Sequence, residues 1–155
     1  MSELLLEIGT EEIPSGYIED GLKELKRLAE TRLEEARVPV GGGLKTLGTP
    51  RRLVLLGRDV AGRQEDTVQE VTGPPVRAAF DESGNPTQAG LGFARKQGVA
   101  VEDLGRVDTP KGEYVFVRRD IPGRPAGEVL AELIPGVIRD IPWPKSMRWG
   151  SVGFL

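Results

Sequence analysis

The stretch LLLEIGTEEIP, residues 4–14, is the part of the chain that says most about its fold. Its near-continuous apolar run predicts a buried β-strand over residues 2–9. Pro14 then suits the first turn of a helix, where its missing N–H costs little. From there up to Ala36 the apolar residues recur at the spacing of one helical face. The stretch therefore predicts a strand that runs directly into a long amphipathic helix.

Extended segments follow the glycine run at residues 41–43. Residues 44–47 and 53–60 predict two paired strands, joined by the sequence GTPRR at residues 48–52, and a further extended segment covers about residues 66–72. Asn85-Pro86 predicts the start of a short helix, and Gly98 suits the left-handed position after its end. Residues 107–114 predict a β-hairpin.

A last amphipathic helix is predicted around residues 129–138, and Pro135 inside it predicts a kink or a split. Gly73-Pro74-Pro75 is the clearest internal boundary in the sequence. We therefore predict an α+β fold of two small lobes, residues 1–73 and 74–140, in which antiparallel strands pack with one long and two shorter helices. Residues 141–155 are expected to begin a following domain of a longer protein.

Composition excludes several classes of chemistry. The chain has 155 residues with no cysteine and no histidine, so disulfides, thiolate or imidazole metal sites and Ser-His-Asp catalysis are excluded. The net charge of −3 means that any nucleic-acid surface must be local. With no targeting signal and no long apolar run, we expect a cytoplasmic protein with no membrane partner. Since there is also no visible cluster of carboxylates or lysines at useful spacing, we expect no catalytic residue and no metal site.

Two groups of basic residues are candidates for binding phosphate, because arginine presents a planar fork of donors. The first is Arg51 and Arg52 in the predicted turn, with Arg58 and Arg63 beyond it. The second accompanies the aromatic residues Phe93, Tyr114 and Phe116, and consists of Arg95, Lys96, Arg118, Arg119 and Arg124. The alternatives left open are an ordinary solvated turn and cations that complement a helix C-terminus.

The segment IPWPKSMRWG, residues 141–150, combines two tryptophans with two cations. It predicts a domain junction or a partner-facing surface formed by Trp143, Lys145, Arg148 and Trp149.

An ordered set of motifs resembles one family. They are residues 4–14, TPRRL at 49–53, GPP at 73–75, AFD at 79–81, GNPT at 84–87, GFAR at 92–95, KGEY at 111–114 and residues 141–150. In this order they resemble the N-terminal part of the bacterial glycyl-tRNA synthetase β subunit. Each motif alone is weak, but the ordered set is specific and extends over nearly the whole chain.

The resemblance implies a fragment of a longer β subunit that works in a heterotetramer of two α and two β subunits. It implies that the α subunit carries the class II active site and uses ATP and magnesium, so this fragment binds no cofactor itself. It also implies that the β subunit binds tRNA-Gly, and that its N-terminal region resembles the body and tail of CCA-adding enzymes, which hold the acceptor arm.

The predicted function is thus a non-catalytic, tRNA-binding accessory region of glycine–tRNA ligase. The candidates for phosphate contacts are Arg51, Arg52, Arg95, Arg118 and Arg119, since A-form RNA is recognised mainly by its shape, phosphates and 2′-hydroxyls. The alternative is a subunit- or domain-interaction module of the same enzyme that does not contact tRNA directly.

Overall fold

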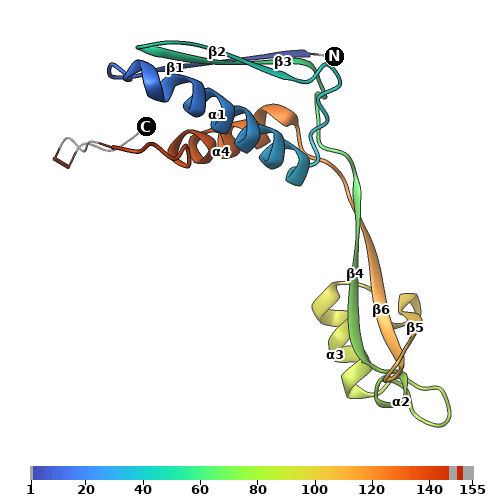
Figure 1. The fold of residues 1–155 in the computed structure, drawn as a ribbon. Helices are drawn as coiled ribbons and strands as arrows, with labels where there is room; N and C mark the ends of the chain where they lie inside the picture. Colours follow the sequence, from blue (N-terminus) through green and yellow to red (C-terminus); the bar gives the residue numbers. More distant parts are fainter. Residues whose placement is uncertain (1, 147–149, 152–155) are drawn as a thin grey trace. The chain divides into compact units, whose positions relative to one another are not determined.

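The structure, a computed structural model, describes residues 2–146 and 150–151 and divides the chain into two compact units (Figure 1). Unit 1 contains residues 1–65 and 122–155, and unit 2 contains residues 66–121. The predicted α+β class is confirmed. The predicted lobes at 1–73 and 74–140 need correction, because the last helix packs with the N-terminal residues and unit 2 is an insertion between them.

Unit 1 contains an antiparallel sheet and two helices. Strand β1 (Ser2–Gly9) leads into helix α1 (Ser15–Glu35), and strands β2 (Leu44–Thr49) and β3 (Arg52–Val60) form the hairpin that follows. The strand order is β1-β3-β2, so β3 is central. Helix α4 (Ala126–Arg139) completes the unit after the insertion. The strand-to-helix junction and the strand pair were both predicted correctly.

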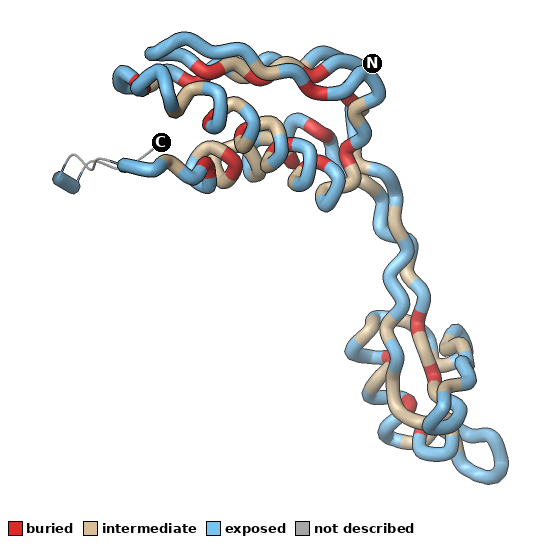
Figure 2. The backbone as a smooth tube through the Cα atoms, in the orientation of Figure 1, coloured by how far each residue is buried: buried red, intermediate tan, exposed pale blue. Residues whose placement is uncertain are grey.

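The core of unit 1 lies between the sheet and the two helices. Leu53 and Leu55 of β3 are 1% and 2% exposed, and Leu25 of α1 is fully buried. Burying one such side chain contributes about 1.5–3 kcal/mol relative to leaving it in water. Val137 of α4 and Ile141 belong to the same cluster. Figure 2 shows buried segments in red on the strands and on the helices of unit 1. Because Ile141 is part of this core, the prediction that residue 141 begins a following domain is wrong at that residue.

Helix α1 ends in a tight backbone motif. The N–H of Val38 donates to the carbonyl of Leu33 at 2.9 Å, and the N–H of Arg37 donates to Glu34 at 2.9 Å. This pairing defines a Schellman motif, whose left-handed residue is usually glycine. Here Arg37 occupies it with φ 54°. The Nε of Arg37 donates to the carbonyl of Glu65 at 3.2 Å, which helps to hold this backbone conformation.

Helix α4 runs through Pro135 without a split. A proline inside a helix removes one backbone hydrogen bond. The buried residues Val129 and Val137 lie on either side of it and face the same core. Packing against that core therefore outweighs the missing bond, and the split expected from the sequence does not occur.

Unit 2 contains a second antiparallel sheet with the order β4-β6-β5. Its elements are β4 (Thr67–Pro75), α2 (Val76–Ala79), α3 (Gln88–Gln97), the 3-10 turn η1 (Val101–Asp103), β5 (Gly105–Thr109) and β6 (Gly112–Ile121). Helix α3 packs on one side of the sheet, where a Cβ at Gly73 would lie 2.7 Å from the ring of Phe93. Val115 and Val117 of the central strand β6 are 0% and 2% exposed.

Two details of unit 2 differ from the sequence predictions. Gly73-Pro74-Pro75 lies inside β4, at a shift of register between Thr72 and Pro75, and is not a boundary between units. Helix α3 begins at Gln88 and not at Pro86, because Thr87 is the N-cap and its hydroxyl accepts from the N–H of Gly90. Gly98 has the expected left-handed conformation, with φ 69°.

None of the helices in the described part of the chain is long and apolar enough to cross a membrane.

Candidate nucleic-acid interface

The turn between β2 and β3 holds the first pair of candidate arginines. Thr49 pairs with Arg52 across the hairpin, so Pro50 and Arg51 occupy the two central positions of the turn. Proline favours the first of these because its φ is already set. Both arginines are exposed.

The backbone of this turn is fastened by the opening stretch of the chain. The N–H of Thr10 donates to the carbonyl of Arg51 at 3.1 Å, and the N–H of Ile13 donates to the carbonyl of Pro50 at 2.6 Å. Strand β1 also pairs Gly9 with Arg52. The strand-to-helix junction and the arginine turn therefore form one local structure, although about 40 residues of sequence separate them.

The two guanidinium groups of the turn differ in their partners. Arg52 lies 3.9 Å from a carboxylate oxygen of Glu7, with both side chains more than half exposed. An exposed pair at this distance is worth little. Within the described residues, Arg51 has no ion pair and no side-chain hydrogen bond. The backbone of Arg51 is thus held in place, and its guanidinium group is available to a ligand.

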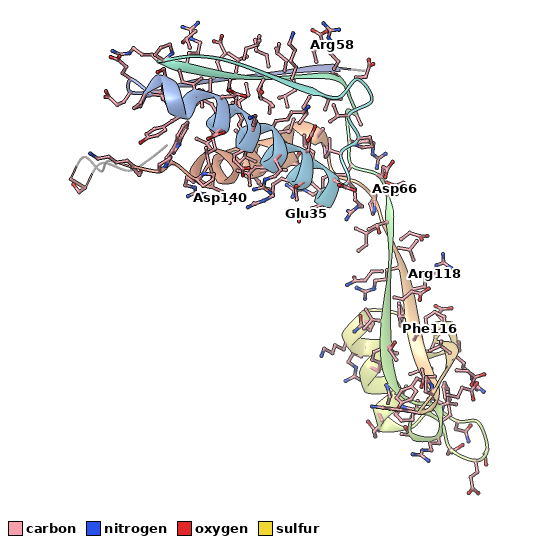
Figure 3. All side chains as sticks on the ribbon, in the orientation of Figure 1. Glu35, Arg58, Asp66, Phe116, Arg118 and Asp140 are labelled. Atoms are coloured by element: carbon pink, nitrogen blue, oxygen red, sulfur yellow. The ribbon has the colours of Figure 1, made fainter. Side chains whose placement is uncertain are left out.

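The candidates in unit 2 lie on two different sides of its sheet. Arg118 and Phe116 share one face of β6 (Figure 3), and Phe116 covers Gly105 on the neighbouring strand β5. Arg119 alternates to the side of α3, where its Nη2 would lie 3.8 Å from a Cβ at Gly98. The single basic stripe considered from the sequence is therefore divided by the sheet.

Arg119 lies at the end of α3, whose last turn carries Arg95 and Lys96. All three cations are near a helix C-terminus, where positive charge is stabilising. Arg95 and Lys96 are exposed, whereas Arg119 is half-buried. This arrangement fits cations that complement the C-terminus of a helix as well as cations that bind phosphate.

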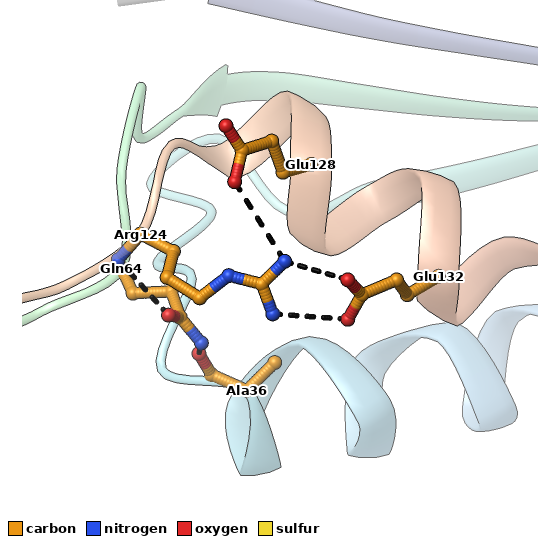
Figure 4. A network of polar contacts seen from close by, with 5 residues as sticks. All are labelled: Ala36, Gln64, Arg124, Glu128 and Glu132. Atoms are coloured by element: carbon orange, nitrogen blue, oxygen red, sulfur yellow. Dashed lines mark hydrogen bonds and ion pairs between the residues drawn. The ribbon is translucent and has the colours of Figure 1, made fainter.

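Arg124 was grouped with the basic residues of the second group in the sequence analysis, but the structure places it in another unit. It lies in unit 1, and its guanidinium binds both carboxylate oxygens of Glu132, at 2.6 and 3.0 Å, and approaches Glu128 at 3.7 Å (Figure 4). These carboxylates raise the pKa of Arg124, Glu132 more than Glu128. Its charge is used inside the unit, which removes it from the candidates for phosphate contacts.

The candidates in the tryptophan segment are only partly described. Trp143 is half-buried against α1, with its ring over Gly21, and Lys145 is exposed. Arg148 and Trp149 lie outside the described residues. The structure thus gives Trp143 a partner within its own unit, and its predicted contact with another protein stays a prediction.

The structure also contains features that the sequence analysis did not single out. Gln64 connects the end of α1 to the backbone of Arg124 (Figure 4). Leu5 and Leu47 are exposed on the sheet of unit 1. In the part of the chain that is described, no three side chains of His, Cys, Asp or Glu gather in a way that would hold a metal ion.

Comparison with known proteins identifies the family. The family described as glycyl-tRNA synthetase beta subunit matches residues 4–154. The chain belongs to the glycyl-tRNA synthetase β subunit family. This confirms the resemblance seen in the ordered motifs.

Individual relatives agree with the family match. The glycine–tRNA ligase β subunit of Syntrophus aciditrophicus is 46% identical over 99% of this chain and 22% of its own length. That of Syntrophotalea carbinolica is 50% identical over 96% of this chain and 21% of its own length. That of Desulforudis audaxviator is 50% identical over 99% and 22%. The chain spans about a fifth of the length of the curated relatives it matches.

The motifs on which the resemblance was based lie at definite places in the fold of this chain. TPRRL forms the turn from β2 into β3, GPP forms the irregular end of β4, and KGEY forms the turn into β6. These are junctions that set the path of the backbone.

Proposed function

We propose that this chain is the N-terminal region of the β subunit of glycine–tRNA ligase and that it binds tRNA without taking part in the chemistry. Aminoacylation would take place on a separate α subunit that uses ATP and magnesium. The observation that carries the proposal is Arg51, an exposed cation without an internal partner among the described residues, on a turn fastened at 3.1 and 2.6 Å by the opening stretch.

A fastened turn suits phosphate recognition for a physical reason. A long side chain loses rotational freedom when it binds, and a rigid backbone beneath it avoids a further entropic cost. The guanidinium fork matches two phosphate oxygens. Because the chain as a whole is negative, such contacts are expected to guide RNA to a small region and not to the entire surface.

We further propose that the ligand is the acceptor arm of tRNA-Gly. The resemblance to the β-subunit family implies a likeness to the body and tail of CCA-adding enzymes, and this expected likeness favours the acceptor arm. An acceptor arm is an A-form helix, which proteins recognise through phosphates and 2′-hydroxyls. The candidate cations of each unit, Arg51 and Arg52 in unit 1 and Arg95 and Arg118 in unit 2, are exposed arginines, whose donor forks match phosphate oxygens.

The experiment is a titration of tRNA-Gly with the 155-residue chain at several salt concentrations. Changing Arg51 and Arg52 together to alanine should weaken binding and reduce the slope of log K against log salt by about 0.7–0.9 for each phosphate that is no longer bound. Arg27→Ala is the matched control, because Arg27 is also exposed but is already paired with Glu24 at 2.7 Å.

The control should bind tRNA as the unchanged chain does. The double change removes two cations and Arg27→Ala removes one, so an effect of Arg27→Ala about half that of the double change would show that only net charge matters. No binding at low salt would remove tRNA contact from the function of this region.

A second candidate function is interaction within the enzyme, with the α subunit or with another part of the β subunit. In this case the chain would assemble into the heterotetramer of two α and two β subunits without touching tRNA. The specific observation that favours an interaction surface is the exposed apolar face of the unit 1 sheet, where Leu5 is 63% exposed.

A further inference from the structure

The two faces of the unit 1 sheet have different surroundings. Leu53 and Leu55 point toward the core, so Val54 and Leu56 point away from it. The register places Leu5 opposite Leu56 and Leu47 opposite Val54. These four side chains, Leu5, Leu47, Val54 and Leu56, therefore lie together, and we refer to them as the outer apolar face.

The outer apolar face is open to solvent. Leu5 is 63% exposed and Leu47 is 47% exposed, which makes them the two most exposed large apolar residues in the described part of the chain. Val54 and Leu56 between them are half-buried. Single exposed leucines are common on protein surfaces. Two that flank an apolar pair on the central strand form a continuous patch, and such patches mark interaction sites.

The sequence of the strands supports the same conclusion. A strand of an antiparallel sheet with one face in water usually alternates between apolar and polar residues, whereas a strand covered on both faces is apolar throughout. Strand β1 contains LLL at residues 4–6, and β3 contains LVLL at residues 53–56. Helix α1 covers one face of this sheet. The middle of β1 and of β3 thus has the sequence of a sheet that is covered on its second face as well, whereas the outer positions around it, Glu7, Lys45 and Arg52, are charged.

The charges around the patch indicate what covers it. Glu7 pairs with Val54 and Lys45 pairs with Leu56, so an acidic and a basic side chain share the outer face, and the guanidinium of Arg52 joins them 3.9 Å from Glu7. Both are exposed. A nucleic acid would favour a rim of one sign, whereas an apolar centre with a mixed polar rim is the usual composition of a protein–protein interface.

The size of the patch distinguishes a covering domain from a separate partner. A stable interface between separate proteins buries about 800 Å² on each side and uses about 20–30 residues. The outer apolar face supplies four apolar side chains, a small part of such an interface. A segment of the same polypeptide needs less contact, because its effective concentration is on the order of millimolar. The relatives are longer than this chain, which aligns to 22% of the Syntrophus protein.

We propose that the outer apolar face is a docking site for another part of the same β-subunit polypeptide, one that lies in the portion of the full-length protein that this chain does not span. The inference rests on the proposed origin of the chain as a region of a longer β subunit. It does not depend on whether this region binds tRNA.

Cysteine labelling tests the proposal cleanly, because the chain has no cysteine of its own. Leu5→Cys places a thiol at the most exposed position of the patch, and Leu47→Cys provides a second position. Thr31→Cys is the control, since Thr31 is exposed on α1, away from the sheet face. The labelling rate of each site is measured in the 155-residue chain and in the full-length β subunit, with the modified peptide identified by mass spectrometry.

The expected result is that residues 5 and 47 react at least about tenfold more slowly in the full-length β subunit, while residue 31 reacts equally in both. Equal rates at residues 5 and 47 in the two proteins would overturn the proposal. It would also be overturned if protection arose only on addition of the α subunit, or only as the 155-residue chain was concentrated, because these results would assign the face to a separate subunit or to a second copy.

The same samples are titrated with tRNA-Gly. Absence of tRNA binding, with residues 5 and 47 still protected in the full-length β subunit, would reject the proposed function and leave the docking site intact. If tRNA binds but the thiols at residues 5 and 47 react equally fast in both proteins, only the docking site is rejected.

Discussion

The indole ring of Trp143 occupies the space that a side chain at position 21 would fill. A Cβ at Gly21 would lie 2.7 Å from Cζ3 of Trp143, closer than carbon atoms approach without displacement. Gly21 is buried in the middle of α1, where glycine otherwise weakens a helix. The contact fixes the segment after α4 on the surface of α1, so a helix-destabilising residue is explained by the tryptophan that needs its space.

Gly21→Ala should release Trp143 from α1. Alanine raises helix stability by about 1 kcal/mol at such a position, but displacing a large apolar ring from its packed position outweighs this gain. We expect a net loss of about 0.5–2 kcal/mol in the free energy of unfolding. In a Trp149→Phe background Trp143 is the single fluorophore of its kind, and its emission should shift to longer wavelength with greater quenching by acrylamide.

Gly16→Ala is the matched control for this change. Gly16 lies in the same helix with no atom within 4 Å of its Cβ position. It should stabilise the chain by up to about 1 kcal/mol and leave the fluorescence unchanged. An unshifted Trp143 emission in the Gly21→Ala chain would contradict the packing of this ring on α1.

The side chain of Gln64 is the second contact with a testable consequence. Its Nε2 donates to the carbonyl of Ala36 at 2.7 Å, and its Oε1 accepts from the N–H of Arg124 at 3.0 Å. Gln64→Ala leaves two backbone groups without these partners, which should cost about 1–3 kcal/mol. Chemical denaturation followed by circular dichroism would measure it.

Gln64→Glu gives the same test a pH dependence. The new carboxylate can still accept from Arg124 but faces the carbonyl oxygen of Ala36, so folding favours its protonated form and raises its pKa. The penalty relative to the unchanged chain should therefore be full above this raised pKa and shrink as the pH falls through it. A penalty that does not vary with pH would show that the carboxylate does not meet the carbonyl.

The backbone N–H of Arg124 should contribute more to the stability of the chain than its guanidinium group does. Its guanidinium binds Glu132 and Glu128 at the surface, where ion pairs contribute little and salt screens them. Arg124→Ala keeps the backbone N–H that donates to Gln64. We expect a smaller loss of stability than for Gln64→Ala, and one that disappears at high salt. A loss as large as that of Gln64→Ala would contradict this assignment.

The sequence was sufficient where a local pattern determines local structure. The helical spacing after Pro14, the turn at Pro50 and the left-handed Gly98 each depend on neighbours in the chain. The division into units was wrong because it depends on which distant segments pack together. Pro74 and Pro75 are typical of a boundary, yet the register shift in β4 accommodates them within a strand.

The candidate arginines show the same difference. Their types and positions were visible in the sequence, but their partners were not. Arg118 and Arg119 are adjacent in sequence and lie on opposite sides of the sheet because side chains alternate along a strand. The carboxylates that bind Arg124 lie on α4, which begins after it, and the spacing of Glu128 and Glu132 along that helix was a signal that could have revealed the pairing.

The loop after α2 should be sensitive to acid. Asp81 accepts from the N–H groups of Asn85 and Ser83 at 2.8 and 2.9 Å. These bonds, that from Asn85 first, lower the pKa of Asp81. A carboxylate with a lowered pKa contributes its full stabilisation above the pKa of the unfolded chain, and loses it as the pH falls through the lowered value.

Hydrogen exchange at the amides of Ser83 and Asn85 would measure this. Exchange, corrected for its intrinsic pH dependence, should be protected at neutral pH and become faster under acid. Asp81→Asn keeps an oxygen acceptor and should remove the pH dependence, whereas Asp81→Ala should remove protection at every pH. Acid-induced exposure that persists in the Asp81→Asn chain would assign the effect to another group.

Arg118 and Arg119 provide the sharpest test of how unit 2 would meet RNA. Arg119 is half-buried beside Gly98 at the end of α3, so Arg119→Ala should lower the stability of unit 2 by about 0.3–1 kcal/mol through the loss of a cation at a helix C-terminus. Arg118 is exposed on the opposite face. Arg118→Ala should leave stability unchanged and weaken tRNA binding, with the salt slope reduced by about 0.7–0.9. Thermal unfolding and tRNA titration of the two chains separate the effects. Should Arg119→Ala weaken binding while Arg118→Ala does not, the side of the sheet that carries α3 would be the one that contacts RNA.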